Sequence, residues 1–595
     1  MKVYQGIARL LHAAGVTTVF GVMGDGNMQW LAEYADLPGT SWCPAWHEAG
    51  AVGMADGYAV AAGRAAELTL GGGTTGSAET TVGVATVTMG PGVAQALGAL
   101  TAAVRTRSPV LVITAEPAHV TPPNSQDIDQ RSWAATAGAR YWLMTSPDDI
   151  GGVLASALVR ARSGEPGVVA IAAELMECEF DWQSAVAAIA GLQPARAFRA
   201  GSGQDEALRA AAQLLAGSAR PVVLLGRGAV AGSAIPAAVE LGHRIGAGFL
   251  STVPAKGCIA RFRDPFDLGL AGTMAHPAAR EIAASADVVL VIGAALDLHN
   301  TARGSFFGSA ELIRIDCRPP TELWQPGWPI TEITSGSATA VTQLGRWLPG
   351  NSRPGLRTAA TEELLAREPA RHAALVAGQP ADGLNPWAVM AAIDGAVGDN
   401  AHIVSGVGHF WYFAAPYLSA RPDRSFHFGF GFGLIGQCVP LAAGAAVAAR
   451  ADGRPGRPTV AIEGDGSFLM NLQELQSAVR FGADLLVLVL NNEAYGSEFH
   501  KLGIAGLDPA GGSFPHPVDI SAVATALGAD ARRVRTLAEL RAGLDAFARA
   551  GGVRVLDIAI ARSVMSEAYQ LMHLGRDTAG APESTATRDY QGAPS

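Results

Sequence analysis

The chain has 595 residues and a mass of 61.0 kDa, which at about 100 to 200 residues per domain predicts three or four domains. Hydrophobic residues make up 49% of the sequence and charged residues 16%, a composition that supports large buried cores and excludes long disordered stretches. The formal net charge of -10 excludes a basic surface that would hold a nucleic-acid backbone. We therefore expect a globular protein without a nucleic-acid partner.

The N-terminus and the cysteines indicate the compartment. The first 22 residues have helical apolar spacing but no basic head and no continuous apolar segment, and no apolar stretch reaches the roughly 18 residues needed to cross a bilayer. The five cysteines lie far apart and form no CxxC pair, which argues against a zinc ribbon or a disulfide framework. We expect a cytoplasmic protein with no membrane partner.

Short runs rich in Val, Leu and Ile recur along the chain, with helical stretches between them. The runs are TVFGV, SPVLVITA, GVVAIAA, RPVVLLG, DVVLVIGAA, LIRID, HIVSG, TVAIEGD, LLVLVLNN and VRVLDIAI. Apolar runs of this length, joined by helices, predict strands that are buried on both faces of parallel sheets. The predicted fold class is therefore α/β, with doubly wound parallel sheets.

Two shifts in composition divide the chain. After Phe180 and again after Trp347, the alternation of strands and helices lapses into stretches rich in small residues and proline, which are typical of linkers. We predict three α/β domains, at residues 1–182, 200–348 and 380–563. Residues 564–595 end in a polar stretch and are expected to form a C-terminal tail.

The motif IEGDGSF, residues 462–468, places Asp465 between two glycines after an apolar run. Residues 459–465 read as a strand, 467–482 as a helix and 485–492 as the next strand. Asp465 and Asn492 therefore both follow parallel strands and are expected to converge at one edge of the sheet. With the backbone carbonyl of Ala494 they would form the all-oxygen set that Mg²⁺ or Ca²⁺ prefers. The N–H groups of Gly466 and Ser467 would face a diphosphate bridged by the metal.

The GDG tripeptide has two other interpretations. Alone it is more often a plain turn than a site, and a second copy at residues 24–27 has Val52 at the spacing where a second ligand would be needed. The segment GFGLIG at residues 431–436 matches the glycine pattern of a dinucleotide site, but no acidic residue about 20 residues further on supports it. A metal-bridged diphosphate is the interpretation that the spacing favours.

Residues 464–496, GDGSFLMNLQELQSAVRFGADLLVLVLNNEAYG, resemble the thiamine diphosphate signature. About 560 residues of the chain resemble the acetolactate synthase and 2-oxo-acid decarboxylase superfamily, in the order pyrimidine-binding, central and diphosphate-binding domain. The resemblance implies that Asp465, Asn492 and Ala494 hold Mg²⁺. It also implies that Glu48, in AWHEAGAVGMADGYA, is the catalytic glutamate that hydrogen-bonds the cofactor's aminopyrimidine. Without the resemblance, Glu48 would be read as an ordinary carboxylate at a helix start.

The resemblance also implies cofactor contacts from several glycine-containing turns. The residues concerned are Gly90, Gly92, Gln126, Gly408, His409, Gly433, Ile435, Gly464, Gly466 and Ser467. Gln126 would lie near the thiazolium and act with Glu48 in catalysis. Ile435 would wedge the cofactor into a bent shape, and His409 would touch the diphosphate.

The chain departs from acetolactate synthases after the asparagine pair, where it reads EAYGSEFHKLG. Glu498 falls where 2-oxo-acid decarboxylases carry a glutamate that handles protons, and GDGN resembles their first-loop motif, which would give Asp25 a similar role. Each has an alternative, because Asp25 would also serve as a helix cap and Glu498 as a solvated surface residue. The decarboxylases' adjacent histidine pair is missing, and only His119 stands in the corresponding region.

The resemblance implies an enzyme that breaks and forms C–C bonds. The leading hypothesis is a carboligase, similar to acetolactate synthase, that depends on thiamine diphosphate and Mg²⁺. It would decarboxylate a pyruvate-like 2-oxo acid and ligate the remaining unit to a second carbonyl compound. One alternative is a decarboxylase that releases an aldehyde, and another is a lyase or hydrolase acting on a diketone or acyloin. A silent regulatory protein that binds the cofactor is the alternative outside enzymes.

The resemblance also bears on a second cofactor and on assembly. The central domain resembles the one that binds FAD in acetolactate synthases, although relatives without flavin keep the same fold, so FAD is a further candidate cofactor. The family builds each site from the pyrimidine-binding domain of one subunit and the diphosphate-binding domain of another. We therefore expect a homodimer or homotetramer.

Overall fold

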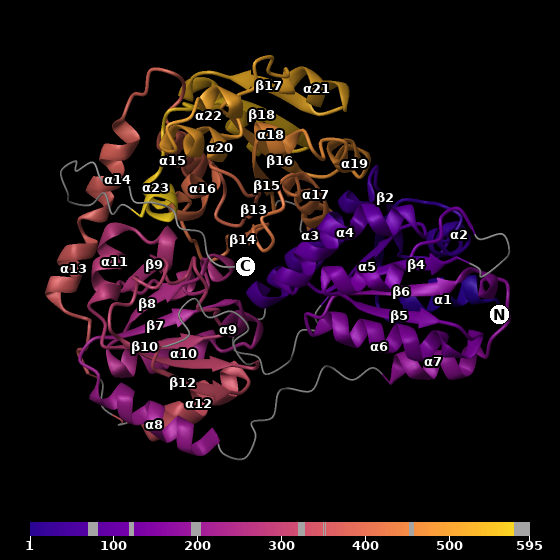
Figure 1. Cartoon of the computed structure of the whole chain (residues 1–595), viewed down its shortest axis with the longest axis horizontal. Coiled ribbons are helices and arrows are strands. Elements are labelled where there is room, and N and C mark those ends of the chain that lie inside the picture. Colours follow the sequence, from indigo (N-terminus) through magenta and orange to yellow (C-terminus); the bar gives the residue numbers. More distant parts are fainter. Residues whose placement is uncertain are drawn as a thin grey trace.

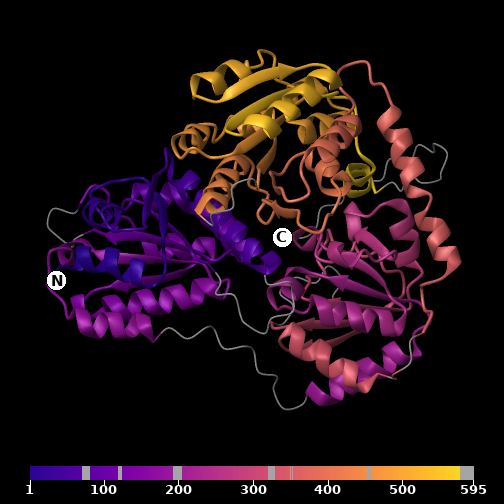
Figure 2. The same cartoon turned by 180° about the vertical axis from the view of Figure 1, so that it is seen from behind.

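The computed structural model describes residues 1–69, 81–117, 124–191, 204–318, 328–348, 350, 353–451 and 457–575. His119 and residues 576–595 of the expected tail lie outside this range. The chain forms three six-stranded sheets in which every strand pairing is parallel (Figure 1). Helices flank each sheet, as the view from behind also shows (Figure 2). The predicted fold class, three doubly wound α/β domains, is therefore confirmed.

The first sheet has the strand order β2-β1-β3-β4-β6-β5. Its strands are β1 (Thr18–Gly21), β2 (Ser41–Pro44), β3 (Gly83–Thr86), β4 (Val110–Glu116), β5 (Arg140–Met144) and β6 (Gly167–Ala172). Its helices are α1 (Val3–Ala13), α2 (Met28–Ala35), α3 (Glu48–Thr69), α4 (Pro91–Thr106), α5 (Gln130–Ala137), α6 (Ile150–Arg162) and α7 (Trp182–Ala190). The direction of strand addition reverses between β1 and β3, so this sheet has its switch point there.

The second sheet has the order β12-β11-β10-β7-β8-β9, with its switch point between β7 and β10. Its strands are β7 (Pro221–Leu225), β8 (Gly248–Ser251), β9 (Asp267–Leu270), β10 (Val288–Ile292), β11 (Glu311–Asp316) and β12 (Ile330–Thr334). Its helices are α8 (Gln204–Gly217), α9 (Arg227–Ala231), α10 (Ile235–Ile245), α11 (Pro277–Ala284) and α12 (Ser337–Trp347). Two further helices, α13 (Ala359–Leu365) and α14 (Glu368–Ala377), run along the outside toward the third sheet (Figure 2).

The third sheet has the order β14-β13-β15-β16-β18-β17, with its switch point between β13 and β15. Its strands are β13 (His402–Ser405), β14 (Ser425–Phe428), β15 (Thr459–Gly464), β16 (Leu485–Asn491), β17 (Asp530–Val534) and β18 (Val553–Ala559). Its helices are α15 (Pro386–Ala396), α16 (Trp411–Tyr417), α17 (Cys438–Ala451), α18 (Asp465–Phe468), α19 (Glu474–Arg480), α20 (Gly496–Ile504), α21 (Ile520–Ala526), α22 (Leu537–Ala550) and α23 (Glu567–Leu574).

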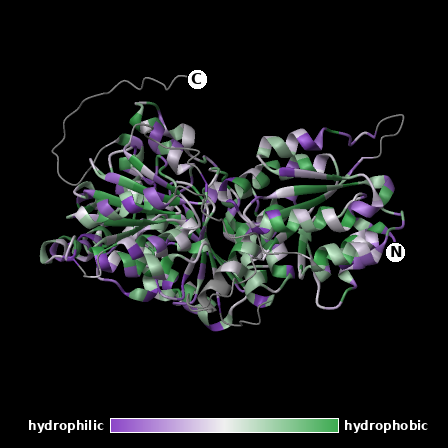
Figure 3. Ribbon diagram, turned by 90° about the horizontal axis from the view of Figure 1, so that it is seen from below, coloured by the Kyte–Doolittle hydropathy of each residue, from purple (hydrophilic) through white to green (hydrophobic). Residues whose placement is uncertain are grey.

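Sequence patterns account for these elements locally. The strands that lie inside the sheets consist almost wholly of buried residues, as in β7, β10 and β16, which agrees with helices covering both faces. Helix starts carry the expected caps: Asp181 accepts from the N–H groups of Gln183 and Ser184, and Thr536 forms a capping box with Glu539. Figure 3 shows strands that are mostly hydrophobic and helices that carry both hydrophobic and hydrophilic residues.

The expected single helix over residues 467–482 is interrupted. The structure has α18, a turn at residues 469–473, and then α19. The interruption lies at Asn471, whose side-chain Nδ2 donates to the carbonyl of Gly436, 2.8 Å away, and whose own carbonyl accepts from Glu474 N. A side chain that bonds outside the helix competes with helical hydrogen bonding.

Helices α3 and α17 pack the first and third domains together at backbone distance. A side-chain carbon at Gly57 of α3 would lie 1.8 Å from the carbonyl oxygen of Leu441, and one at Gly444 of α17 would lie 1.9 Å from that of Met54. Glycine is required at both positions, since any larger residue would push the helices apart. Figure 1 shows α3 at the boundary between these two domains.

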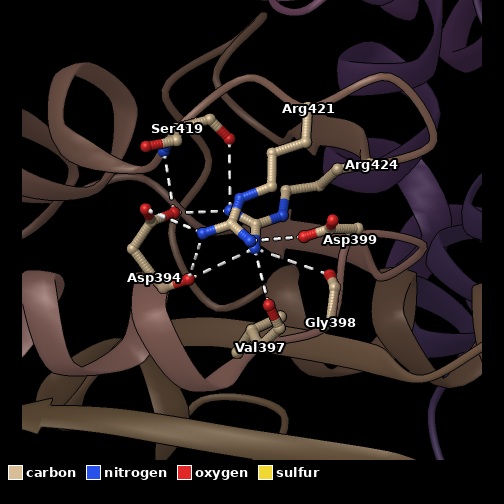
Figure 4. A network of polar contacts seen from close by, with 7 residues as sticks. All are labelled: Asp394, Val397, Gly398, Asp399, Ser419, Arg421 and Arg424. Atoms are coloured by element: carbon tan, nitrogen blue, oxygen red, sulfur yellow. Dashed lines mark hydrogen bonds and ion pairs between the residues drawn. The ribbon is translucent and has the colours of Figure 1, made fainter.

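A network of ion pairs fixes the start of β14 (Figure 4). The guanidinium group of Arg424 pairs with Asp394 and donates to the carbonyl of Val397 at 2.6 Å, beyond the end of α15. Burial raises the pKa of Asp394, but hydrogen bonds from Ser419 and the charge of Arg424 outweigh it, so the net shift is downward. The network anchors the strand that leads into the predicted cofactor-wedge segment.

No helix among the described residues combines the length and apolar character that a bilayer crossing requires. All five cysteines lie within the described part of the chain and are free thiols, two of them buried.

Candidate active site

In the first domain, the residues predicted to contact the cofactor follow four neighbouring strands. Asp25 lies in the loop after β1, Glu48 after β2, Gly90 and Gly92 after β3, and Gln126 after β4. These strands occupy consecutive places in the order β2-β1-β3-β4. The carboxyl ends of parallel strands form one edge of the sheet, so the fold gathers all five residues there.

Glu48 is the first residue of α3 and is only 7% exposed. Its Oε1 lies 3.5 Å from the place where a side-chain carbon at Gly92 would be, so the carboxylate faces the turn after β3. The preceding residue, His47, uses Nδ1 to accept the N–H of Ala49 at 3.0 Å. The carboxylate is thus held at a helix N-terminus, where the helix dipole favours its negative charge.

The glycine turn after β3 lies against Gln126. Gly90 has φ of +67°, and a side chain there would come within 1.9 Å of the carbonyl oxygen of Gln126. The N–H of Gly90 donates to the side chain of Gln130 at 2.9 Å. The structure therefore places Gly90 against Gln126, two residues that the family pattern predicts to contact the cofactor.

Asp25 is exposed, and it is not the capping residue of α2. Asn27 occupies the N-cap position and is buried, where it accepts from Gly24 N and donates to Val22 O and Thr86 Oγ1. The loop is anchored by Asn27, and the carboxylate of Asp25 faces solvent.

The third domain repeats this arrangement at the edge of its own sheet. The segment with Gly433 and Ile435 follows β14, Gly408 and His409 follow β13, Asp465 follows β15, and Asn492 follows β16. The four strands are again consecutive, and Gly408 and Asp465 flank the switch point.

Asp465 is the first residue of α18 and is 4% exposed. Burial raises the pKa of its carboxyl group to about 7. Hydrogen bonds from the backbone N–H groups of Asp465, Gly466 and Glu493 oppose this rise but are outweighed. No cation among the described residues forms an ion pair with it. A buried carboxylate without a cationic partner is unfavourable unless a metal or proton neutralises it.

Asn492 and Ala494 lie in the loop that follows β16. Both are buried, and among the described residues neither the Asn492 side chain nor the Ala494 carbonyl makes a hydrogen bond. The intervening Glu493 has φ of +56°, a strained left-handed conformation for a residue with a side chain. Amide and carbonyl oxygens without hydrogen bonds, next to a buried carboxylate, are donors of the type that would suit Mg²⁺.

Neighbouring groups hold this loop in place. Asn491 donates to Asp557 at 2.8 Å and accepts the N–H of Glu493 at 3.0 Å, while Arg562 donates to the backbone carbonyl of Asn492 at 2.7 Å. The described residues contain no group of three or more His, Cys, Asp or Glu side chains suited to a metal. A metal here would therefore depend on one carboxylate together with amide and carbonyl oxygens.

The glycines beside Asp465 leave no room for side chains. A side chain at Gly466 would come within 2.8 Å of Tyr495 and 3.0 Å of Phe514, and one at Gly464 would meet Phe410 at 3.1 Å. Ser467 directs its hydroxyl to the carboxylate of Glu463 at 2.5 Å, so only its backbone N–H is left for a diphosphate.

Glu463 is a buried carboxylate that the sequence analysis missed. Burial raises its pKa to about 7, opposed by hydrogen bonds from Ser467 and from the N–H groups of Gly464 and Cys438. A side chain at Gly406 would meet Glu463 at 2.4 Å. The acidic residue immediately before GDG was the available sequence signal.

The predicted wedge segment lies against the first domain. Leu434 sits 3.4 Å from the place where a side-chain carbon at Gly98 of α4 would be, and a side chain at Gly431 would meet Thr106 at the end of that helix. Gly433 has φ of +68° with open space around it, and Ile435 is half-buried. Within this chain, the segment with Gly433 and Ile435 therefore lies against α4 of the first domain.

His409 belongs to a cluster of aromatic rings that sequence reasoning did not find. Its ring centre lies 4.5 Å from that of His500 on α20 and 4.8 Å from that of Tyr569 on α23. Burial lowers the pKa of His409 well below its usual value and that of His500 to about 4, so both rings are neutral at pH 7. Tyr569 also contacts His573, which bonds Tyr412. The C-terminal helix therefore packs over the loop that contains His409.

Glu498 lies on the exposed side of α20. Its side chain is 59% exposed and lies 3.8 Å from the ammonium group of Lys501, one turn further along α20. The structure does not bring it beside Asp465 or Glu48.

The second sheet offers a glycine-lined switch point for the candidate flavin. A side chain at Gly226, after β7, would lie 2.2 Å from the carbonyl oxygen of Gly293, after β10, and Gly293 has φ of +59°. These glycines pack against each other's backbone. This is the place where a doubly wound sheet would bind a dinucleotide.

The buried carboxyl groups of Asp465 and Glu463 predict a pH effect on the metal-free protein. Because each pKa is higher in the folded chain than in the unfolded chain, the folded chain binds more protons between about pH 4 and 7. Stability should fall as pH rises through 7, by up to about 1.4 kcal/mol per pH unit for each group.

Calorimetry of the EDTA-treated protein at pH 6 and pH 8 measures this effect. Asp465→Asn should weaken the pH dependence of the thermal midpoint, and the difference from wild type separates Asp465 from the buried histidines, which act in the opposite direction below pH 6.5. The same pH dependence in both proteins would contradict the prediction.

Comparisons with known proteins agree with this arrangement. Residues 1–132 match the thiamine pyrophosphate enzyme N-terminal TPP binding domain, residues 208–324 the central domain of these enzymes, and residues 406–558 the C-terminal TPP binding domain. The chain is 30% identical over 571 residues to a probable 2-ketoarginine decarboxylase, AruI, of Pseudomonas aeruginosa, covering 93% of each chain.

Acetolactate synthases are also similar to the chain. The acetolactate synthase of Mycobacterium bovis is 28% identical over 498 residues, which are 82% of this chain and 75% of that one. The large subunit of acetolactate synthase isozyme 1 of Escherichia coli is 26% identical over 567 residues, 93% of each chain.

The edge of the first sheet holds a buried glutamate, and the edge of the third sheet holds a set of oxygen atoms suited to a metal. Together with the three α/β domains, these features indicate a cofactor-dependent enzyme. The chain belongs to the superfamily of thiamine pyrophosphate enzymes that includes the acetolactate synthases. The resemblance seen in the sequence is thereby confirmed.

Proposed function

We propose that the protein is a carboligase dependent on thiamine diphosphate and Mg²⁺. It would decarboxylate a pyruvate-like 2-oxo acid and join the remaining unit to a second carbonyl compound. The observation that carries the proposal is that Glu48 is buried at the strand-end edge of the first sheet and Asp465 is buried at the strand-end edge of the third. A cofactor with a pyrimidine at one end and a diphosphate at the other would span them.

Each edge would hold a different part of the cofactor. Asp465, Asn492 and the carbonyl of Ala494 would hold Mg²⁺, and their free oxygens support this assignment. Glu48 would hold the pyrimidine and move a proton at its ring nitrogen. The bound cofactor supplies the nucleophilic carbon and takes up the electrons of the broken C–C bond.

The surroundings of two carboxylates support ligation over simple decarboxylation. A decarboxylase needs an acid that protonates carbon, and raising the pKa of a carboxyl group for that task requires burial. Asp25 and Glu498, the residues predicted for this role, are both exposed in the chain. Attack on a second carbonyl compound needs no such acid at the carbon.

A decarboxylase is the second candidate. The relative with 30% identity, whose match covers 93% of each chain, is described as a probable 2-ketoarginine decarboxylase. This similarity favours release of an aldehyde and raises 2-ketoarginine as a donor to be tested.

The assembly and the flavin are further parts of the proposal. The protein would form a homodimer or homotetramer with each site between two subunits, and FAD would bind at the glycines of the second sheet's switch point.

Product analysis tests the proposed reaction. The protein is incubated with thiamine diphosphate, Mg²⁺ and pyruvate or 2-ketoarginine, with and without a ketone or aldehyde acceptor, and the Glu48→Gln variant gives the background. We expect an acyloin or acetolactate whose formation follows acceptor concentration. Aldehyde as the sole product with every acceptor would contradict the carboligase and support the decarboxylase.

A further inference from the structure

The start of α3 is held by a carboxylate from the third domain. Oε1 of Glu474 accepts the N–H of Trp46 at 3.1 Å and that of His47 at 3.0 Å. These two peptide groups immediately precede Glu48 in the chain. Glu474 is the first residue of α19 and is separated from them by more than 420 positions in the sequence.

The carboxylate of Glu474 is buried, and both of its oxygens accept hydrogen bonds. Its side chain is 0% exposed, and Ser477 donates to its Oε2 at 2.7 Å. A side-chain carbon at Gly50, in the first turn of α3, would lie 2.3 Å from Glu474 Oε1. Glycine at position 50 therefore makes the space in which the carboxylate reaches the backbone.

This carboxylate supplies acceptors that the helix start lacks. The N–H groups at and before the beginning of a helix have no partner within the helix. The ring of His47 satisfies the N–H of Ala49, and the side-chain oxygen of Glu474 satisfies those of Trp46 and His47. Loss of Glu474 would leave two donors unpaired in a closed site.

The same short segment also holds the predicted wedge. Asn471, three residues before Glu474, donates to the carbonyl of Gly436 at 2.8 Å, and a side chain at Gly436 would meet Met470 at 2.7 Å. Residues 470–474 thus contact both the segment with Ile435 and the backbone that presents Glu48. Both groups are expected to face the pyrimidine.

We propose that Glu474 is a positioning residue, which fixes Glu48 against the cofactor by binding the two peptide groups that precede it. This inference rests on the proposed role of Glu48. A single oxygen of Glu474 accepts both bonds. The side chain at position 474 must therefore be long enough to bring one acceptor to both N–H groups.

Five variants of the full-length protein separate the reach of the side chain, its charge, the domain interface and the role of Glu48. Glu474→Ala removes the acceptor, Glu474→Asp keeps the charge but is too short, and Glu474→Gln keeps the reach without the charge. Gln476→Ala is the matched control, because Gln476 lies on the same helix and bonds the indole N–H of Trp46 at 2.8 Å without touching the backbone. Glu48→Gln reports on the proposed function itself.

Two measurements follow the variants. The first is deuterium exchange of backbone amides in the peptide around residues 45–50 of the cofactor-free protein, read by mass spectrometry. The second is the exchange rate of the thiazolium C2 proton in protein loaded with thiamine diphosphate and Mg²⁺, read by NMR after acid quench, together with cofactor affinity.

We expect Glu474→Ala and Glu474→Asp to speed amide exchange and to slow C2-proton exchange, each by about tenfold or more, with cofactor affinity largely kept. Glu474→Gln and Gln476→Ala should stay close to wild type in both measurements. If the alanine variant does not fold, the comparison of Asp with Gln decides.

Wild-type behaviour of Glu474→Asp, or a loss in Glu474→Gln as large as that in Glu474→Asp, would overturn the inference. If Glu48→Gln loses C2-proton exchange while the Glu474 variants keep it, only the positioning role fails. If Glu48→Gln keeps wild-type exchange, the proposed function of Glu48 fails first, and the positioning role fails with it.

Discussion

Glu48→Gln is expected to reduce turnover by about a hundred- to ten-thousandfold, the usual contribution of a group that moves a proton in the reaction. Gln fills the same space and keeps one acceptor, so the buried position at the start of α3 should be tolerated and the thermal midpoint should change little. Steady-state kinetics and circular dichroism of the wild type and the variant measure both quantities.

The matched control for this variant is Glu539→Gln. Glu539 also lies in the first turn of a helix, α22, where its backbone N–H donates to the capping residue Thr536. It belongs to neither group of predicted site residues. It should lose a little stability and no activity. Full activity of Glu48→Gln would contradict the catalytic role of Glu48. The residue would then be an ordinary carboxylate at the start of a helix.

Asp465→Asn is expected to abolish metal-dependent binding of thiamine diphosphate. Residues that merely support metal ligands contribute about ten- to a hundredfold to affinity, so loss of the only charged ligand in the proposed set should exceed this range. Calorimetric titration of the cofactor in the presence of Mg²⁺, with EDTA-treated wild type as the control, measures the loss.

This variant has a second signature that a folding defect would not produce. The cofactor-free Asp465→Asn protein should be more stable than cofactor-free wild type at pH 8, because the variant no longer buries a carboxylate whose pKa is raised to about 7. Cofactor affinity equal to that of wild type would remove Asp465 from the metal site.

The sequence predicted the inner strands better than the edge strands. The ten apolar runs correspond to β1, β4, β6, β7, β10, β11, β13, β15, β16 and β18. The sheet edges, β2, β5, β9, β12, β14 and β17, gave no such run, and most of them are short or partly exposed. An edge strand is not covered on every side, so its residues need not be continuously apolar.

The placement of Asp465 and Asn492 after neighbouring parallel strands was predictable because it depends on local rules. Each residue directly follows a strand, and successive parallel strands end at the same edge. The family resemblance added Glu48, whose surroundings no periodicity reveals. Glu48 lies beside Gly92, and Glu474 binds the backbone just before it. Both contacts join segments that are far apart in the sequence.

Other parts of the site had no sequence signal that a pattern could detect. The cluster of His409, His500 and Tyr569 joins a loop, a helix after the metal loop and the C-terminal helix. The hydrogen bond from Asn471 to Gly436 interrupts a stretch whose spacing is helical. Such tertiary contacts override local preference, which is why these features emerged only from the structure.

The most direct test of the central claim is a crystal structure of the protein with thiamine diphosphate and Mg²⁺. We predict that the metal is bound by Asp465, Asn492 and the carbonyl of Ala494, and that the pyrimidine lies within hydrogen-bond distance of a Glu48 carboxylate. A cofactor bound with its diphosphate away from Asp465, or with its pyrimidine out of reach of every Glu48 in the assembly, would contradict the account.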